Sequence, residues 1–207
     1  MAWLFPRIYD RAVARTEEAC MAAWRADLIR PLAGDVLEIG AGTGLNLRHY
    51  PATVRRLVVT DPEPAMLERL RRRRADLTAA VELQVEQASA DHLPFGKASF
   101  DAVVCTLVLC SVPDPPAVLA EVRRVLRPEG RLVFLEHVAA EGRPRRLTWQ
   151  RRVEPVWKRV AGGCHLTRRT ADAIEAAGFR IDTITRESAR KALPVVRPTI
   201  RGAAVPV

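Results

Sequence analysis

The stretch Val36–Gly44, with the sequence Val-Leu-Glu-Ile-Gly-Ala-Gly-Thr-Gly, constrains the fold of this chain more than any other segment. Its mostly apolar first half predicts a short buried strand, and its three alternating glycines predict a tight turn. Glycine suits such a turn because a residue without a Cβ adopts positive φ and lets a ligand approach the backbone. Residues Leu45–Tyr50 are expected to begin a helix whose free N–H groups face that ligand. The stretch therefore predicts either a nucleotide-binding strand, turn and helix or an ordinary glycine turn.

An acidic residue follows the next apolar run and favours the nucleotide-binding interpretation. Leu57–Thr60 predicts a second buried strand, and Asp61 comes directly after it. The offset from Gly40 fits the spacing of about 20 residues at which an acid meets ribose hydroxyls in nucleotide-binding βαβ units.

Apolar runs and amphipathic segments alternate along most of the chain, whose 207 residues we expect to form a single domain, 1–207. The patterns predict helices at 7–30, 63–77, 115–126 and 167–177. They predict strands at 35–39, 55–60, 81–85, 100–105, 131–138 and 179–185, with a last strand within 193–207. This cadence indicates an α/β fold with a doubly wound, mostly parallel sheet.

Two segments invite a functional interpretation beside a structural one. Residues 7–30 form either an N-terminal helical cap over the ligand or an ordinary packing helix. Residues 140–166 break the strand–helix cadence and place Trp149 and Trp157 on one helical face, with a kink expected at Pro155. That face belongs to the core, lines the substrate side as an insertion, or lies on a membrane surface.

Charge and composition limit the kinds of partner and the cellular location that the sequence favours. The formal net charge is +9 with a pI near 10.4, but the arginines are scattered, so a solvated surface is favoured over nucleic-acid binding. No apolar run approaches the roughly 20 residues that span a bilayer, and the N-terminus lacks a signal-peptide pattern. We therefore expect a cytoplasmic protein with four free thiols, and membrane contact at most peripheral. The cysteine spacings match no zinc pattern, so no metal site is expected.

Several blocks together resemble the class I S-adenosylmethionine-dependent methyltransferases. They are Leu37–Gly44, Asp61–Pro62, Ser89–Phe95, Ser99–Asp101 and Val125–Leu132, within a region of about 34–187. The resemblance implies S-adenosyl-L-methionine as cofactor. It also implies a Rossmann-like, three-layer α/β/α fold with seven strands, the seventh antiparallel.

A narrower similarity points to the methyltransferase-like alkyl-thiol methyltransferases. It rests on Cys105–Val112, Glu121–Pro128, Glu136–Val138, Glu154–Lys158 and Gly163–Arg168. An apolar N-terminal helix anchors those relatives to the endoplasmic reticulum, and this chain begins close to where that anchor would end. The similarity implies a small, lipophilic thiol as methyl acceptor.

The resemblance also implies residue roles. Gly40, Gly42 and Gly44 would hold the amino acid end of the cofactor, which Glu38 would orient. Asp61 would bind the ribose hydroxyls, with Pro62 beside the adenine. Ser89 and Ala90 would meet the adenine amine, and Thr106 and Leu107 would line the methyl-donor channel.

Methyl transfer from a sulfonium is an in-line displacement, so alignment of the acceptor and exclusion of water contribute most of the catalysis. A thiol, whose pKa is ordinarily about 8.5, needs modest help to ionise at neutral pH. His137, at the end of the fifth expected strand, and His165, in the irregular segment before Thr167, are the candidate bases. Each is alternatively a structural or substrate-contacting histidine.

The leading hypothesis is therefore an S-adenosylmethionine-dependent thiol S-methyltransferase with a small-molecule substrate and no obligate protein partner. The alternative enzyme is an N-methyltransferase that acts on a phospholipid amine at a membrane surface. A catalytically idle cofactor-binding module that regulates a partner is a different class of function. A fourth hypothesis, direct binding of RNA, is based only on the positive net charge.

Overall fold

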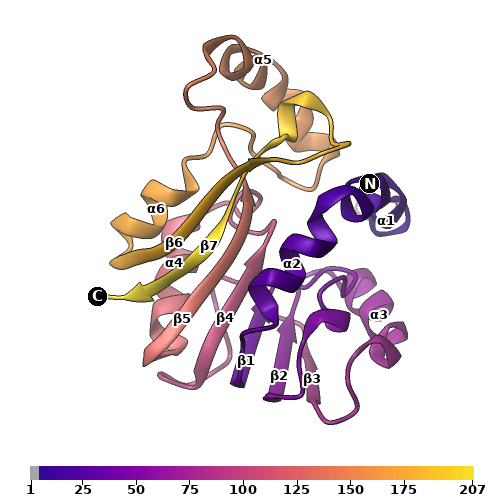
Figure 1. The fold of residues 1–207 in the computed structure, drawn as a ribbon, viewed down its shortest axis with the longest axis vertical. Helices are drawn as coiled ribbons and strands as arrows, with labels where there is room; N and C mark the ends of the chain where they lie inside the picture. The colour runs from indigo at the N-terminus through magenta and orange to yellow at the C-terminus, as the bar shows by residue number, and fades with distance from the viewer. Residues whose placement is uncertain (1–4) are drawn as a thin grey trace.

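The structure is a computed structural model that describes residues 5–207, apart from the side chains of residues 5–9 and 12. All seven of its strands belong to one sheet in the order β3-β2-β1-β4-β5-β7-β6 (Figure 1). Only β7 runs antiparallel to its neighbours, β5 and β6, which confirms the mostly parallel, doubly wound sheet. The strands are β1 Gly34–Ile39, β2 Val54–Thr60, β3 Glu82–Glu86, β4 Phe100–Thr106, β5 Leu126–His137, β6 Phe179–Ser188 and β7 Pro198–Pro206.

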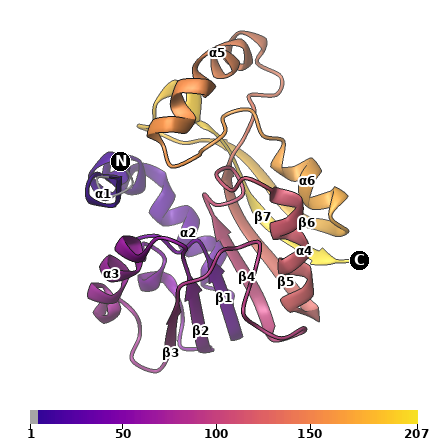
Figure 2. The same cartoon turned by 180° about the vertical axis from the view of Figure 1, so that it is seen from behind.

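Helices cover both faces of this sheet, as a three-layer fold requires (Figures 1 and 2). They are α1 Phe5–Thr16, α2 Ala22–Ile29, α3 Pro64–Arg72, α4 Pro115–Val125, α5 Pro144–Val160 and α6 Thr170–Ala176. One apolar core joins the sheet to α4 and α6, and a second joins the opposite face to α2 and α3. The π-helical segment η1 Glu17–Met21 connects α1 to α2.

The strand order reverses between β1 and β4, which are direct neighbours although β2 and β3 come between them in the chain. In open α/β sheets, ligands bind outside the carboxyl ends of the strands at such a switch point. The glycine turn after β1 and the loop after β4 meet there, so this edge of the sheet positions the candidate site.

The segment after the glycine turn differs from the expected helix. Residues 45–50 form turns and the short 3₁₀ helix η2 Leu47–His49, after which Tyr50 is extended. Pro51 explains the difference, because a proline disfavours the α conformation of the residue before it and donates no N–H. The prediction of an α-helix at 45–50 was therefore wrong.

Other boundaries shift by a few residues. Strand β5 begins at Leu126 rather than 131, α6 begins at Thr170 rather than 167, and the expected 63–77 helix ends at Arg72 before the 3₁₀ segment η3 Arg74–Asp76. Pro155 lies inside α5 without ending it. The four cysteines are buried free thiols. Within residues 5–207, no helix combines the length and hydropathy needed to cross a membrane.

Candidate active site

The three glycines of the turn after β1 all have positive φ, of 59°, 56° and 81° at Gly40, Gly42 and Gly44. A Cβ on Gly40 would lie 2.6 Å from the Val108 side chain, so packing requires glycine there. Among the described atoms, none would lie within 4 Å of a Cβ on Gly42. Gly42 therefore borders open space, a cradle in which a ligand can lie directly against the backbone.

Asp61, directly after β2, faces this turn. One carboxylate oxygen accepts a hydrogen bond from the Gly42 N–H at 2.9 Å, and the other accepts from the Glu63 N–H at 2.9 Å. Asp61 is buried, and burial raises the pKa of its carboxyl although both N–H groups lower it. Asp61 thus braces the turn from the side of β2, and an ionised carboxylate has lone pairs left for ligand hydroxyls.

Glu38 lies beneath the turn, within β1, and is fully buried. Its carboxylate accepts from the Tyr50 hydroxyl at 2.6 Å and from the Asn46 amide at 2.9 Å. Burial raises the pKa of Glu38 to about 7, and hydrogen bonds from Tyr50 and Asn46 and the charge of Arg25 oppose that rise. The side chain therefore has a fixed orientation at the end of the strand.

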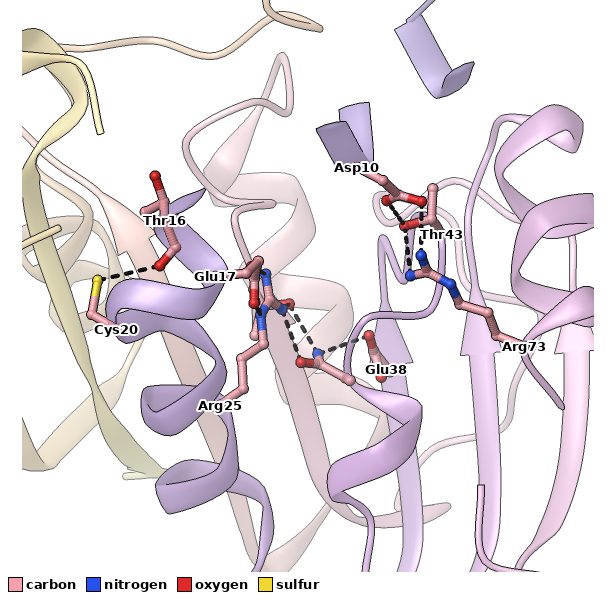
Figure 3. Close-up of polar contacts among 10 residues, drawn as sticks. Asp10, Thr16, Glu17, Cys20, Arg25, Glu38, Thr43 and Arg73 are labelled. Carbon is pink, nitrogen blue, oxygen red and sulfur yellow. Dashed lines mark hydrogen bonds and ion pairs between the residues drawn. The ribbon is translucent and has the colours of Figure 1, made fainter. Parts of the chain in front are cut away.

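Arg25 of α2 closes this network from the other side of the turn, as Figure 3 shows. Its guanidinium donates to the Asn46 amide oxygen at 2.8 Å and to the Thr106 hydroxyl at 3.0 Å. An ion pair with Glu17 at 3.0 Å balances its charge. The network fixes Thr106, the last residue of β4, against the glycine turn. Sequence reasoning missed Arg25, Asn46 and Tyr50, because nothing in their spacing shows that they converge on Glu38.

Helix α1 reaches the glycine turn through Asp10 (Figure 3). Thr43 donates its hydroxyl to Asp10 at 2.7 Å, and Arg73 of the segment after α3 pairs with the other Asp10 oxygen at 2.8 Å. The N-terminal segment therefore contacts the turn itself. The side chain of Tyr9, the aromatic residue directly before Asp10, lies outside the described residues.

The remaining cofactor candidates lie along the same edge. Pro62 and Ser89 are exposed, whereas Ala90 is buried in the core under the loop after β3. Leu107, directly after Thr106, is partly exposed and has a φ of 61°. Positive φ is strained for a leucine, and such strain concentrates at functional sites.

Glu136, near the end of β5, holds the loop that follows Leu107. One of its oxygens accepts from the N–H groups of Val108 and Leu109 at 2.9 and 3.0 Å, and the other accepts from Cys110 N–H at 3.0 Å. Burial raises the pKa of Glu136 to about 7, against the three N–H groups that lower it. Sequence reasoning named Glu136 only within the block Glu136–Val138 of the narrower similarity and missed this role.

The two candidate bases occupy different places. His137, at the end of β5, hydrogen-bonds the Val196 backbone, and burial lowers its pKa to about 4, so its imidazole is neutral near pH 7. Its buried Nδ1 has no hydrogen-bond partner among the described residues. His165 is partly exposed, with Nδ1 3.4 Å from a Glu154 oxygen, and its backbone N–H donates to Cys110 at 2.7 Å. His165 thus lies against the loop after β4, whereas His137 faces the segment before β7.

Comparison with known proteins agrees with this geometry. Residues 37–134 match a family described as a methyltransferase domain. The chain is 41% identical over 171 residues to the thiol S-methyltransferase TMT1B of Homo sapiens, an alignment that covers 82% of this chain and 70% of that protein. It is 43% identical over 148 residues to TMT1B of Rattus norvegicus, covering 70% of this chain and 59% of the rat protein, less than two-thirds of its length.

Two further similarities are more distant. A phosphatidylethanolamine N-methyltransferase of Cereibacter sphaeroides is 32% identical over 139 residues, with 66% of each chain aligned. The solved structure of a geranyl diphosphate methyltransferase in complex with SAM superposes with a TM-score of 0.69 at 18% identity, covering 92% of this chain and 86% of that one. That second likeness concerns the fold alone.

The seven-stranded sheet, the glycine turn beside Asp61 and the matched domain define an S-adenosylmethionine-dependent methyltransferase of class I. Within that class, the chain belongs to the family that includes human TMT1B.

Proposed function

We propose that this protein transfers the methyl group of S-adenosylmethionine to a small, lipophilic thiol. The observation that carries the proposal is the open cradle at Gly42, bounded by Asp61, in a chain 41% identical to a thiol S-methyltransferase. The cofactor supplies a methyl group that its sulfonium charge already activates. The protein then has to bind, align and desolvate the two reactants.

The proposed cofactor residues follow the carboxyl edge of the sheet. Gly40, Gly42 and Gly44 would bind the amino acid end, which the fixed carboxyl of Glu38 would help to orient. Asp61 and Pro62 would contact the ribose and adenine, and Ser89 and Ala90 the adenine amine. Thr106 and Leu107 would border the methyl-donor channel; their position where the Arg25 network and the Glu136-bound loop meet supports that assignment.

His137 and His165 stay the proposed proton acceptors. Both imidazoles have a lowered pKa, so each is unprotonated near neutral pH. The same lowering makes each a weaker base, most of all His137, whose pKa is about 4, so His165 is the better matched of the two to a thiol. A thiolate is the reactive form of the acceptor, and the proton that leaves the thiol would pass to one of these nitrogens or to water.

We further propose that residues 7–30 cap the cofactor and that residues 140–166 bound the acceptor, within one domain. The Asp10–Thr43 hydrogen bond supports the first role, because it joins α1 to the turn. The backbone bond from His165 to Cys110 supports the second, because it joins the segment after α5 to the loop beside Leu107.

The test is a panel of acceptors with S-adenosylmethionine held constant: water-soluble and long-chain alkyl thiols, alkyl amines and phosphatidylethanolamine vesicles. Products are identified by mass spectrometry. We expect S-methyl thioethers, with turnover that rises with the chain length of the thiol. N-methylated phosphatidylethanolamine as the main product would replace the thiol assignment by the second candidate, which the Cereibacter sphaeroides relative favours. Cofactor binding without transfer to any acceptor would indicate a regulatory module.

A further inference from the structure

Helix α5 stands away from the sheet at one end of the molecule (Figures 1 and 2). Its inner face is attached by two polar side chains. Gln150 is buried; its amide oxygen accepts from Ala140 N–H at 2.7 Å, and its amide nitrogen donates to the Val138 and Val195 carbonyls at 3.1 and 2.9 Å. Glu154 accepts from the backbone N–H and the hydroxyl of Thr167. These bonds fix which face of α5 points outward.

That outer face carries an apolar row. Trp149, Val156 and Val160 are 60%, 63% and 65% exposed. They are seven and four residues apart, a spacing that aligns them along one side of a helix. They make up half of the six large, exposed apolar side chains in the described part of the chain. Of the three alternatives for this face, the core is therefore excluded for Trp149: Gln150 and Glu154 attach α5, and the tryptophan faces outward.

A basic row runs beside the apolar row. Arg145, Arg152 and Arg159 recur every seven residues, and each lies three or four positions from Trp149 or Val156. All three are exposed, and none has an acidic partner within ion-pair distance among the described residues. Two further cations of α5, Arg151 and Lys158, point along a different side of the helix.

We propose that this outer face of α5 docks on a membrane surface that contains anionic phospholipid. An interfacial helix inserts aromatic and aliphatic side chains at the boundary between headgroups and acyl chains, while adjacent arginines bind lipid phosphates. Tryptophan is enriched at that depth. The two parallel rows supply both contacts on the same side of one helix.

Other occupants match this face less well. A second copy of the chain would bring its own arginine row against the first, and the like charges would repel. A nucleic acid would pair with the arginines but would leave Val156 and Val160 without an apolar partner. An anionic membrane surface offers an apolar partner for the first row and negatively charged phosphates for the second.

Docking through α5 would also place the acceptor side of the protein at the lipid surface. The chain continues from α5 through Gly163, Cys164 and His165, and the His165 N–H bonds the loop beside Leu107. A lipophilic thiol dissolved in the bilayer would then be concentrated beside the segment that we propose bounds the acceptor. This consequence rests on the proposed function, whereas the docking itself does not.

The experiment is co-sedimentation of the full chain with phosphatidylcholine vesicles, with and without phosphatidylglycerol. We expect binding to the anionic vesicles that weakens with salt. The double variant Arg152→Gln/Arg159→Gln should lower the partition coefficient by about tenfold or more, because each cation near such a surface contributes to the attraction. The matched control Arg151→Gln/Lys158→Gln removes the same charge from another side of the helix and should lower it by much less.

A second pair, Trp149→Ser/Val156→Ser, should lower binding to both kinds of vesicle. All three variants should keep the thermal midpoint and the wild-type affinity for S-adenosylmethionine, because the changed residues are exposed and lie outside the proposed cofactor site. Equal losses from the two charge pairs would overturn the docking face, since net charge alone would then explain binding. The proposal would also be overturned if the wild-type protein did not bind anionic vesicles. It would likewise be overturned if the protein bound RNA with the same dependence on Arg152 and Arg159. Vesicle binding without methyl transfer would count against the proposed function alone.

Discussion

The Arg25 guanidinium lies 3.0 Å from the Thr106 hydroxyl, so the N-terminal helices reach across the glycine turn to the end of β4. Arg25 is itself buried, and its partners Glu17 and Asn46 are bound at 3.0 and 2.8 Å. A buried cation of this kind is stable only when its donors are matched by acceptors. The polar network thus couples the fold of residues 17–25 to the geometry of the cofactor edge.

Arg25→Met should lower the free energy of unfolding by about 3–5 kcal/mol, since it leaves the Glu17 carboxylate and the Asn46 amide oxygen without their partner. Urea denaturation at neutral pH measures this change. Arg30→Met, at the exposed end of α2, is the control and should cost less than about 0.5 kcal/mol. Similar losses in the two variants would mean that the buried network adds nothing to stability.

Asp61→Ala should weaken S-adenosylmethionine binding by about 10- to 100-fold, because charge-assisted hydrogen bonds to the ribose contribute roughly 1.5–3 kcal/mol. Isothermal titration calorimetry measures the affinity. Asp76→Ala removes an exposed carboxylate from η3 and should leave it unchanged. Unchanged affinity in Asp61→Ala, with the protein folded, would remove Asp61 from the cofactor site.

Gly42→Ala and Gly40→Ala should fail in different ways, although both glycines have positive φ. At Gly42 the added methyl enters open space, so the protein should stay folded, with a backbone cost of about 1–2 kcal/mol, while cofactor affinity falls sharply. At Gly40 the methyl would meet Val108, so stability should fall further. Calorimetric titration and thermal unfolding of both variants separate the effects. Normal cofactor binding by Gly42→Ala would place the cofactor elsewhere.

Asp10→Ala should speed cofactor release, because it breaks the contacts of α1 with Thr43 and Arg73. Stopped-flow displacement of a fluorescent cofactor analogue measures the dissociation rate, which we expect to rise severalfold with little change in the association rate. Arg11→Ala, exposed on the same helix, serves as the control. If both variants release the analogue at the wild-type rate, α1 does not cap the cofactor.

The glycine turn, Asp61 and the sheet were predictable from sequence because their signals are local. Glycine spacing and apolar runs report turns and buried strands directly. The Glu38 network was not predictable, because Arg25, Asn46, Tyr50 and Thr106 converge only through the fold. Trp149 shows a second limit of sequence-based prediction. Helical spacing identifies the residues that share a face of α5, but only the hydrogen bonds of Gln150, which the fold creates, determine whether that face points inward or outward. The α-helix predicted at 45–50 does not form because Pro51 disfavours the helical conformation of Tyr50, and this local restriction outweighs the helical preference inferred from the residues before it.

Glu136 offers a pH test of the loop beside the proposed methyl-donor channel. Its pKa is raised from 4.5 to about 7 in the folded protein, so the native state binds more protons than the unfolded state between those values. By linkage, its contribution to stability is fully present below pH 4.5 and is lost as the pH rises toward 7, by about 3 kcal/mol in total. The pKa of His137 is lowered in the folded protein, so its contribution to stability increases as the pH rises. This contribution is the same in wild type and in a Glu136 variant, so it cancels when the two are compared.

The difference in unfolding free energy between wild type and Glu136→Gln therefore isolates this carboxyl. We expect wild type to lose about 2–3 kcal/mol relative to the variant as the pH rises from about 5 to 8, measured by urea denaturation at each pH. Glu129→Gln, on an exposed turn of β5, is the control variant. The opposite slope, with wild type losing stability relative to the variant in acid, would mean that the N–H groups of Val108, Leu109 and Cys110 outweigh desolvation. Glu136 would then hold the loop as a permanent carboxylate.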